Sequence, residues 1–389
     1  MTSTLLAPTE TQTPIAAARS HRSTGLLRGL ENPGQIFSNI TPNWFASVMG
    51  TGIIATAAAT LPVSSPLLHW IAVVMWMLAS LLLVLLAGAT LIHWIAHTET
   101  ARGHHRHPVM SHFYGAPAMA LLTVGAGTLL VGRDVIGLQL ALRIDLVLWS
   151  AGTALGLFIA VAIPYLQFTE HKVEADAAFG GWLMPVVSPM VSASTGAMLL
   201  PHLPQGQARL TMLLACYAMF GLSLLASMMI IPQIWGRLIA HKAGPAAAIP
   251  TFWIVLGPLG QSITAANLLG ANAHLAVSGF LAQALEAFGI LYGVPVLGFA
   301  LLWASIAAVI TIRTAREHLP FSLTWWSFTF PVGTCVTGLS GLAAHTGLVA
   351  FEAMAVAGFI ALATAWLLVA TKTFIGSVIQ GTLFLSPVK

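Results

Sequence analysis

Charge is what this sequence has least of. Only 7% of its 389 residues are charged, whereas 57% are hydrophobic, and the mean hydropathy is +0.88. Soluble domains carry about 25% charged residues, so this composition excludes an ordinary soluble globular protein. It predicts a polytopic membrane protein whose helices pack against lipid.

Cysteine is equally scarce. The two cysteines, Cys216 and Cys335, both lie within apolar runs, which excludes a disulfide framework and a cysteine-based metal site. The formal net charge of +4 comes from basic residues scattered among loops. We therefore expect no nucleic-acid partner and interpret the basic residues as determinants of membrane topology.

Histidine is the one titratable residue type that clusters. Six of the fourteen histidines lie between His93 and His112. The cluster lacks a carboxylate or thiolate framework for a metal, and paired histidines at mid-membrane depth, which a haem requires, are missing. We therefore expect neither a metal nor another cofactor. The cluster is interpreted as surface charge near lipid headgroups or as a weak pH sensor.

The two ends of the chain differ from the rest. Residues 1–40 are rich in Thr, Ser, Ala and Pro and lack the apolar centre and cleavage site of a secretory signal. We expect residues 1–40 to form a disordered cytoplasmic tail and residues 376–389 a short cytoplasmic tail. Residues 41–375 then form the transmembrane domain.

Long apolar runs fill this domain. About 20 apolar residues are needed to cross about 30 Å of hydrocarbon as a helix, and on this rule the sequence predicts an all-α fold with ten spans. The eighth span is 37 residues long, and Pro295 is expected to break it or to divide it into an interfacial piece and a span. The spans are residues 42–62, 67–96, 112–132, 142–168, 181–200, 208–236, 250–271, 276–312, 321–343 and 348–374.

Lysine and arginine fit this count of ten. If the N-terminus is inside the cell, 12 of the 15 basic residues fall on inner segments and 3 on outer segments, the positive-inside pattern. The three outer ones are Arg133, Arg143 and Arg209. We expect a multi-pass protein of the inner or plasma membrane with both termini in the cytoplasm.

Alternate spans repeat one pattern. Each opens with an aromatic residue, at intervals of 69, 69, 71 and 73 residues, so the chain consists of five helical hairpins. A stretch of proline or small polar residues follows each aromatic, and each proline is expected to remove one helical hydrogen bond and to bend its helix. Since freed backbone groups are tolerated only inside protein or beside water, we expect the five odd helices to surround a central pore in a quasi-fivefold arrangement. Close helix packing is the alternative use of small residues. The aromatics are Trp44, Phe113, Trp182, Trp253 and Trp326, and the prolines are Pro117, Pro185, Pro189, Pro258 and Pro331.

The expected path is nearly free of charge. Glu286, Glu352, Asp145, Arg143 and His345 all fall near the outer ends of spans, where an interfacial role is expected, and Glu286 and Glu352 are the candidates for proton coupling. Hydroxyls, kinked backbone and helix N-termini stabilise anions weakly, as conduction requires. The candidate pore-lining residues are Gly50, Thr51, Pro117, Thr128, Pro189, Thr195, Pro258, Gln261, Pro331 and Thr334, with Thr123, Ser188, Ser192 and Ser262 as further hydroxyls.

Three motifs carry a resemblance to a known family. "TPNWFASVMGTGI", "LGPLGQS" and "FSLTWWSFTFPVGT" resemble the tellurite-resistance/dicarboxylate transporter (TDT) family, which includes fungal malate permeases, fungal sulfite efflux pumps and plant slow-type anion channels. The resemblance covers about residues 40–375. It implies ten helices around a pore, a homotrimer, and a phenylalanine of the ninth helix that plugs the pore. This residue matches Phe330, with Phe328 as the fallback.

The resemblance implies transport of small anions. C4-dicarboxylates such as malate or succinate are the first expectation, sulfite efflux is the alternative, and tellurite resistance or conduction of chloride and nitrate follow. We expect no enzymatic activity, because no His/Asp/Glu constellation lies at depth. A channel and a proton-coupled transporter remain open alternatives.

Overall fold

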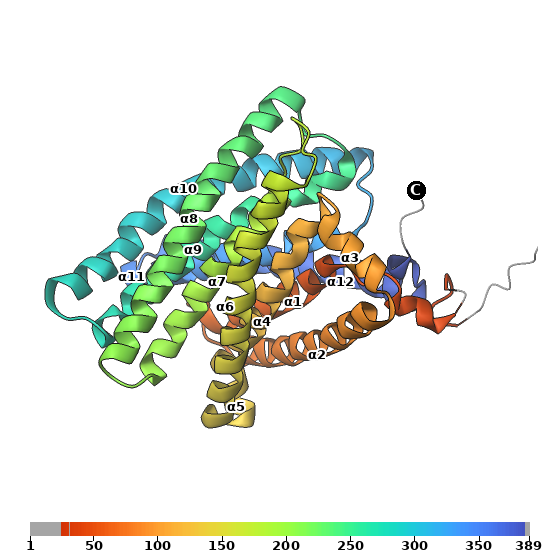
Figure 1. The fold of residues 1–389 in the computed structure, drawn as a ribbon. Helices are drawn as coiled ribbons and strands as arrows, with labels where there is room; N and C mark the ends of the chain where they lie inside the picture. The colour runs from red at the N-terminus through yellow and green to blue at the C-terminus, as the bar shows by residue number, and fades with distance from the viewer. Residues whose placement is uncertain (1–24, 31, 386–389) are drawn as a thin grey trace, which may run out of the picture.

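The computed structural model describes residues 25–30 and 32–385, and its ribbon is helical throughout (Figure 1). No strand occurs within these described ranges. The predicted all-α class is therefore confirmed. Residues 1–24, most of the expected N-terminal tail, lie outside the description, as do residues 31 and 386–389.

Eight helical segments of the described chain are long and apolar enough to cross a membrane. Five are built on long α-helices, the last of which continues into a π segment (Ile375–Ile379): α2 (Pro66–Ala96), α6 (Leu138–Thr169), α8 (Gln207–His241), α10 (Gly279–Glu317) and α12 (Val349–Phe374). The other three combine α-helical with 3₁₀ or π segments around α4 (Gly115–Gly127), α7 (Leu183–Leu199) and α9 (Leu256–Asn272). Two further helices are shorter, with 16 residues in α1 (Phe45–Thr60) and 17 in α11 (Phe330–Thr346).

The eighth predicted span is one continuous helix. Pro295 lies inside α10, which runs unbroken for 39 residues, so the expected break or division does not occur. One helix that the sequence did not predict, α3 (Thr98–Arg106), follows α2 and carries part of the histidine cluster. Its strongly polar composition hid it from a search for apolar runs.

Burial separates the helices into two sets. In the most apolar stretches around α4, α7 and α9, 83%, 94% and 72% of residues are buried, whereas the five long helices have 22–33% buried. Most residues of α1 and α11 are buried as well. The glycine- and hydroxyl-rich helices are therefore inside, and the leucine-rich helices present their side chains outward.

The buried helices contact one another in a closed order. Helix α1 contacts α4, α4 contacts α7, α7 contacts α9, α9 contacts α11, and α11 returns to α1. Each also packs against the long helix that follows it in the chain, from the pair of α1 and α2 to the pair of α11 and α12. The 70-residue repeat is thus expressed as five inner–outer helix pairs.

Each inner helix begins with a short 3₁₀ segment that contains the repeated aromatic residue. The α-helix starts within four residues of that aromatic in every repeat. A tight leader of this kind is common at helix N-termini. The leaders are Pro42–Trp44, Met110–Tyr114, Gly180–Trp182, Ala246–Val255 and Leu323–Phe328.

The repeated prolines do not have the expected effect. Pro117, Pro185, Pro258 and Pro331 occupy the second or third position of their α-helices, where an N–H has no α-helical acceptor and proline is tolerated. The prediction that each removes a helical hydrogen bond is wrong for these four. Only Pro189 lies in a helix interior, that of α7.

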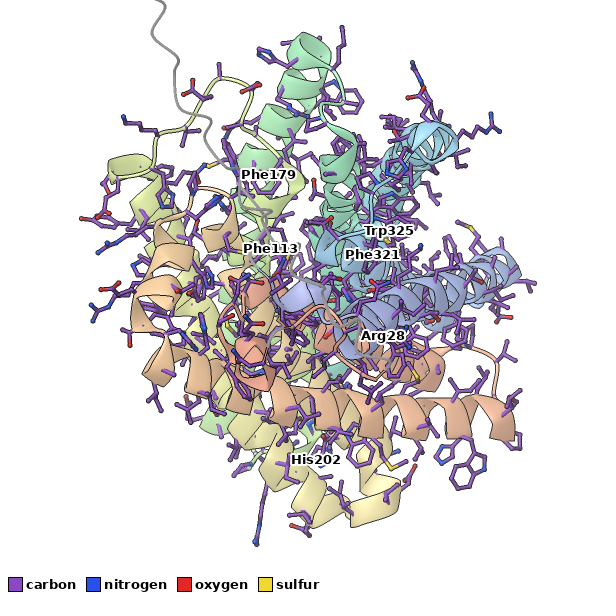
Figure 2. The ribbon with its side chains drawn as sticks, turned by 90° about the vertical axis from the view of Figure 1, so that its right-hand side faces the viewer. Arg28, Phe113, Phe179, His202, Phe321 and Trp325 are labelled. Atoms are coloured by element: carbon purple, nitrogen blue, oxygen red, sulfur yellow. The ribbon has the colours of Figure 1, made fainter. Side chains whose placement is uncertain are left out.

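The described ends of the chain lie together on one side of the bundle (Figure 1). The N–H of Leu27 donates to the carbonyl of Val378 at 3.0 Å, and that of Gly29 donates to Gln380 at 2.7 Å. Figure 2 views the molecule from this side, which carries Arg28. Residues 25–30 and 378–380 therefore pack on each other.

We predict that Gly260→Ala destabilises the protein because α9 and α11 cross at this glycine. A Cβ at Gly260 would lie 2.6 Å from the carbonyl carbon of Thr334, which is backbone and cannot turn away. Overpacking of this kind costs about 1–3 kcal/mol, and the thermal midpoint in detergent should fall. The matched control is Gly257→Ala on the same helix, where a Cβ meets nothing within 4 Å. Equal midpoints for the two variants would contradict this prediction.

Candidate functional site

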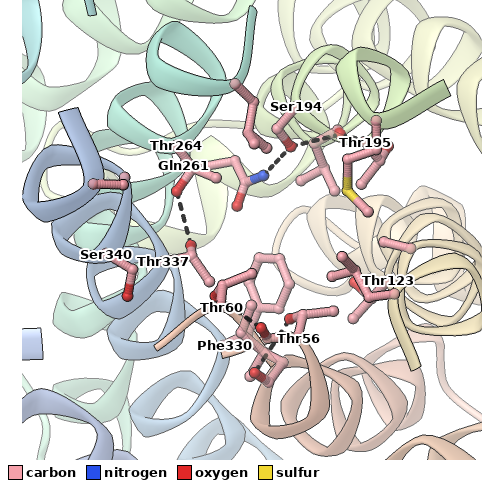
Figure 3. Close-up of a pocket in the computed structure, with 18 residues that line it drawn as sticks. Thr56, Thr60, Thr123, Ser194, Thr195, Gln261, Thr264, Phe330, Thr337 and Ser340 are labelled. Atoms are coloured by element: carbon pink, nitrogen blue, oxygen red, sulfur yellow. Dashed lines mark hydrogen bonds between the residues drawn. The ribbon is translucent and has the colours of Figure 1, made fainter. Parts of the chain in front are cut away.

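A cavity of about 300 Å³ lies inside the closed order of inner helices (Figure 3). All five inner helices line it, together with the π-turn after α4 (Thr128–Gly132), and no outer helix contributes to the described lining. None of the 18 described lining residues carries a charge. The polar ones are Thr56, Thr60, Thr123, Ser194, Thr195, Gln261, Thr264, Thr337 and Ser340, and the apolar ones are Ile53, Ala126, Leu130, Val191, Met198, Leu268, Phe330, Gly341 and Ala344.

The lining follows the chain repeat. Ile53, Thr123, Ser194, Thr264 and Thr337 occupy corresponding places, one per inner helix, at intervals of 70, 71, 70 and 73 residues. Four of these five side chains are hydroxyls. Of these hydroxyls the sequence predicted only Thr123. The aromatic intervals, added in turn to Ile53, fall one to three residues before each of the four.

Hydrogen bonds join the hydroxyls across neighbouring helices. The amide nitrogen of Gln261 donates to the hydroxyl of Ser194, and the hydroxyls of Thr264 and Thr337 lie 2.8 Å apart (Figure 3). Thr195 donates to the carbonyl of Val191 one turn earlier in its own helix, at 2.8 Å. Hydroxyl hydrogens rotate freely, so these groups can turn from such bonds toward an anion in the cavity.

Phe330 borders a second, smaller cavity as well. This cavity has a volume of about 30 Å³, and both it and the larger one have Phe330 in their walls. The larger cavity lies toward the C-terminal halves of the inner helices, whereas the smaller one lies among their N-terminal ends and leaders. The ring of Phe330, the first residue of α11, is 5% exposed. One aromatic side chain thus stands between two hollows of the same five-helix arrangement.

Three of the ten candidate pore-lining residues border these cavities, and so does Thr123 among the four further hydroxyls. Thr195 and Gln261 line the larger cavity, and Pro331 lines the smaller one. Thr51 and Thr128 turn outward instead. The hydroxyl of Thr51 accepts from the indole of Trp366 on α12 at 3.0 Å, and that of Thr128 accepts from Trp76 on α2 at 2.9 Å.

Two further candidates, Gly50 and Thr334, lie at helix contacts. A Cβ at Gly50 would meet Trp326, and Thr334 donates to the carbonyl of Pro331 at 2.7 Å while it faces α9. The three other candidate prolines border neither of the two cavities, and they are Pro117, Pro189 and Pro258.

Phe328 has a different environment from Phe330. It belongs to the 3₁₀ leader of α11, and its ring packs edge-on against Trp253 at 5.8 Å and Trp325 at 5.7 Å. Glu286 is exposed and Glu352 is half-buried. None of these three borders either cavity among the described residues.

Asp145 differs from the interfacial position that the sequence suggested. It is 1% exposed, and neither carboxylate oxygen has a hydrogen-bond partner among the described residues. A Cβ at Gly125 would run into this carboxylate, so the acid packs directly on the backbone of α4. The sequence placed Asp145 near a helix end but could not predict this contact, because no sequence pattern indicates which face of α6 packs against α4.

The histidine cluster lies at the junction of α2 and α3. The ring of His93 stacks on His97 at 6.0 Å and on His104 at 5.3 Å between centroids. In the described part of the chain, no group of three or more His, Cys, Asp or Glu residues is arranged to hold a metal ion. Burial, and then the neighbouring His93, His107 and His105, lower the pKa of His104 from 6.5 to about 4.

We predict that His104 contributes to acid sensitivity of the fold. Between pH 6.5 and about 4 the unfolded chain takes up a proton at His104 that the folded chain does not. The neutral His104 side chain therefore makes its full contribution to the free energy of unfolding above pH 6.5. This contribution is lost as the pH falls toward 4. The variant His104→Gln should flatten this decline in the thermal midpoint. Superimposable midpoint–pH curves for the variant and the parent protein would contradict it.

Comparison with known proteins confirms the resemblance to the TDT family. Residues 39–374 match the family model described as SLAC1, voltage-dependent anion channel. The chain is 29% identical to the sulfite efflux pump SSU1 of Trichophyton rubrum over 342 residues, which are 86% of this chain and 90% of that protein. It is 28% identical over 314 residues to an uncharacterized transporter of Methanocaldococcus jannaschii, covering 80% of this chain and 86% of that protein. The chain belongs to the voltage-dependent anion channel family.

Proposed function

We propose that the protein conducts small, singly charged anions through a pore enclosed by α1, α4, α7, α9 and α11. The observation that carries this proposal is the uncharged cavity, to which every inner helix contributes and whose polar groups are hydroxyls and one amide. Weak binding at several uncharged donors lets an anion enter and also leave. A fixed cation in the cavity would hold it more tightly.

The proposal includes ten membrane crossings as five hairpins in a quasi-fivefold arrangement. The short helices α1 and α11 reach sufficient length when their 3₁₀ leaders are counted. Residues 42–60 then make 19 residues, and residues 323–346 make 24, against the roughly 20 that a crossing needs. The closed order of helix contacts supports the same arrangement.

Phe330 is proposed as the gate. Its position between the two cavities supports this role, because the hollow beyond it is only about 30 Å³ and is walled by residues such as Met49, Met184 and Trp326. An apolar constriction of this size excludes hydrated anions by sterics and dewetting. The packing of Phe328 against two tryptophans supports a structural role for that residue.

Sulfite, in its singly charged hydrogensulfite form, is proposed as the principal substrate. The fungal relatives named as sulfite efflux pumps support this choice. Malate and succinate, the first expectation from the sequence, carry two carboxylates, whose recognition ordinarily uses cationic side chains such as arginine. The described lining offers none, so we place dicarboxylates second, with chloride and nitrate as further singly charged candidates.

Transport is proposed to be passive. Neither Glu286 nor Glu352, the candidates for proton coupling, borders the described cavities, so the membrane potential would drive the anion. The resemblance supports a homotrimer with one pore per subunit in the cell membrane. The excess of basic residues on inner segments supports cytoplasmic termini.

We predict the sidedness of three loops from this arrangement. Cysteines introduced at Gly103 and Ala175 should react with an impermeant thiol reagent only from the cytoplasmic side, and one at Gln205 only from outside. The measurement is labelling of sealed, oriented vesicles in a variant free of Cys216 and Cys335. Reaction of positions 103 and 205 from the same side would exclude five hairpins.

We predict that Phe330→Ala raises anion flux roughly tenfold, which corresponds to a barrier lower by about 1.4 kcal/mol. The range of accepted anions should also broaden, because the ring no longer narrows the path. Phe328→Ala is the matched control. It should leave flux near the parent level and lower stability by about 1–3 kcal/mol, since two aromatic contacts are lost. Increased flux in Phe328→Ala alone would transfer the gate to that residue.

We predict faster uptake of sulfite than of succinate into proteoliposomes at neutral pH under an imposed membrane potential. Uptake should persist in Glu286→Gln and should follow the potential rather than a pH gradient. Loss of uptake in a well-folded Glu286→Gln variant would show that transport is proton-coupled. Preferred uptake of succinate would restore the dicarboxylate assignment.

A further inference from the structure

A groove runs between the outer helices α6 and α8, away from the cavities described above. It has a volume of about 580 Å³ and lies near the C-terminal ends of both helices. Its walls are mainly apolar, with Pro164 and Phe168 on α6 and Ala226 and Met229 on α8. We call this space the α6–α8 groove. The walls belong to helices that present apolar side chains outward, so the groove faces the hydrocarbon of the membrane.

The groove continues into a second hollow with a different character. This hollow has a volume of about 390 Å³, shares Trp182 and Gln233 with the groove, and includes Glu174 and Arg237 in its walls. Ala226, Gln233 and Arg237 follow one another along one side of α8. At 1.5 Å per residue, the apolar wall at Ala226 is about 16 Å from the charge at Arg237. The combined space is apolar at one end and charged at the other, over the dimensions of one lipid.

A buried, unpartnered histidine borders the groove. His112 is 1% exposed, and neither ring nitrogen meets hydrogen-bond geometry with a described residue, although Gln167, which also lines the groove, lies near the ring. Its ring stacks on Trp182 at 6.2 Å, which fixes its orientation. Buried polar atoms without partners cost free energy, and a ligand oxygen in the groove would supply the missing acceptor for the ring N–H.

The charged end offers one group of each sign. Arg237 is held in place by donating through Nε to the carbonyl of Asp176 at 3.1 Å and through Nη1 to that of Ala243 at 3.4 Å. Its Nη2 donates to no described residue, and Glu174 has no ion pair within the described chain. A headgroup with a phosphate and an ammonium complements this pair better than a purely anionic headgroup does.

We propose that this space binds one amine-bearing zwitterionic phospholipid of the phosphatidylethanolamine type. An acyl chain occupies the α6–α8 groove, an ester oxygen accepts from His112, the phosphate faces Arg237, and the ammonium faces Glu174. The topology proposed above places this lipid in the cytoplasmic leaflet. The binding site itself does not depend on which anion the pore carries.

The test is native mass spectrometry of the full chain in micelles that contain equal amounts of phosphatidylethanolamine, phosphatidylglycerol and phosphatidylcholine with identical acyl chains. The parent protein should retain one phosphatidylethanolamine per chain. Ala226→Trp fills the groove and should reduce retention several-fold. The control Leu225→Trp, on an outward position that is 61% exposed and does not border the groove, should retain the lipid.

Two surface variants test the headgroup assignment without disturbing the buried walls. Glu174→Gln should abolish the preference for phosphatidylethanolamine over phosphatidylcholine, and Arg237→Gln should weaken retention of all three lipids. Equal retention by Ala226→Trp and Leu225→Trp would overturn the site. A preference for phosphatidylglycerol would overturn the headgroup assignment. An absence of bound lipid, with Ala226→Trp dissociating an oligomer, would show that this face joins two copies of the chain.

Discussion

Backbone polar groups in hydrocarbon must find partners inside the protein, and this constraint shapes the whole molecule. The helices rich in glycine, serine, threonine and proline are those whose backbone and hydroxyls are least suited to lipid. They are the buried ones, and each is covered by a long leucine-rich partner. Indole N–H groups complete the arrangement. Trp76 and Trp366 reach from outer helices to the hydroxyls of Thr128 and Thr51, so these two outward-facing hydroxyls are also satisfied.

The same constraint accounts for the character of the central cavity. The small residues that let the inner helices approach closely have side chains too small to fill the space at the centre of the bundle. Hydroxyls such as those of Thr264 and Thr337 line this space. A hollow of about 300 Å³ without a fixed charge is a poor tight-binding site. This character fits the proposed function, in which ions are weakly held at several points and pass once the ring of Phe330, the proposed gate, is displaced.

The sequence predicted the parts of this architecture that repeat. The aromatic period of about 70 residues identified the helix pairs and the inner set, because burial of small-residue helices is imposed by lipid on every repeat alike. Its successive intervals, added to Ile53, fall two or three residues before Ser194, Thr264 and Thr337, so the period gives the approximate level of these side chains but does not identify them. Features that depend on one helix contact could not be predicted. The partnership of Thr51 with Trp366 and the burial of Asp145 against Gly125 are set by helix rotation, which composition and spacing leave undetermined.

The central claim is that one path passes through the inner helices and is interrupted at Phe330. Its most direct test is the accessibility of cysteines placed on the two sides of this ring, at Thr337 in the larger cavity and at Ser327 in the smaller one, in a background free of Cys216 and Cys335. A small anionic thiol reagent should reach position 337 only from outside and position 327 only from the cytoplasm. When Phe330→Ala is added, each position should react from both sides. Reaction of both positions from the same side with Phe330 intact, or unchanged sidedness after its removal, would contradict the account.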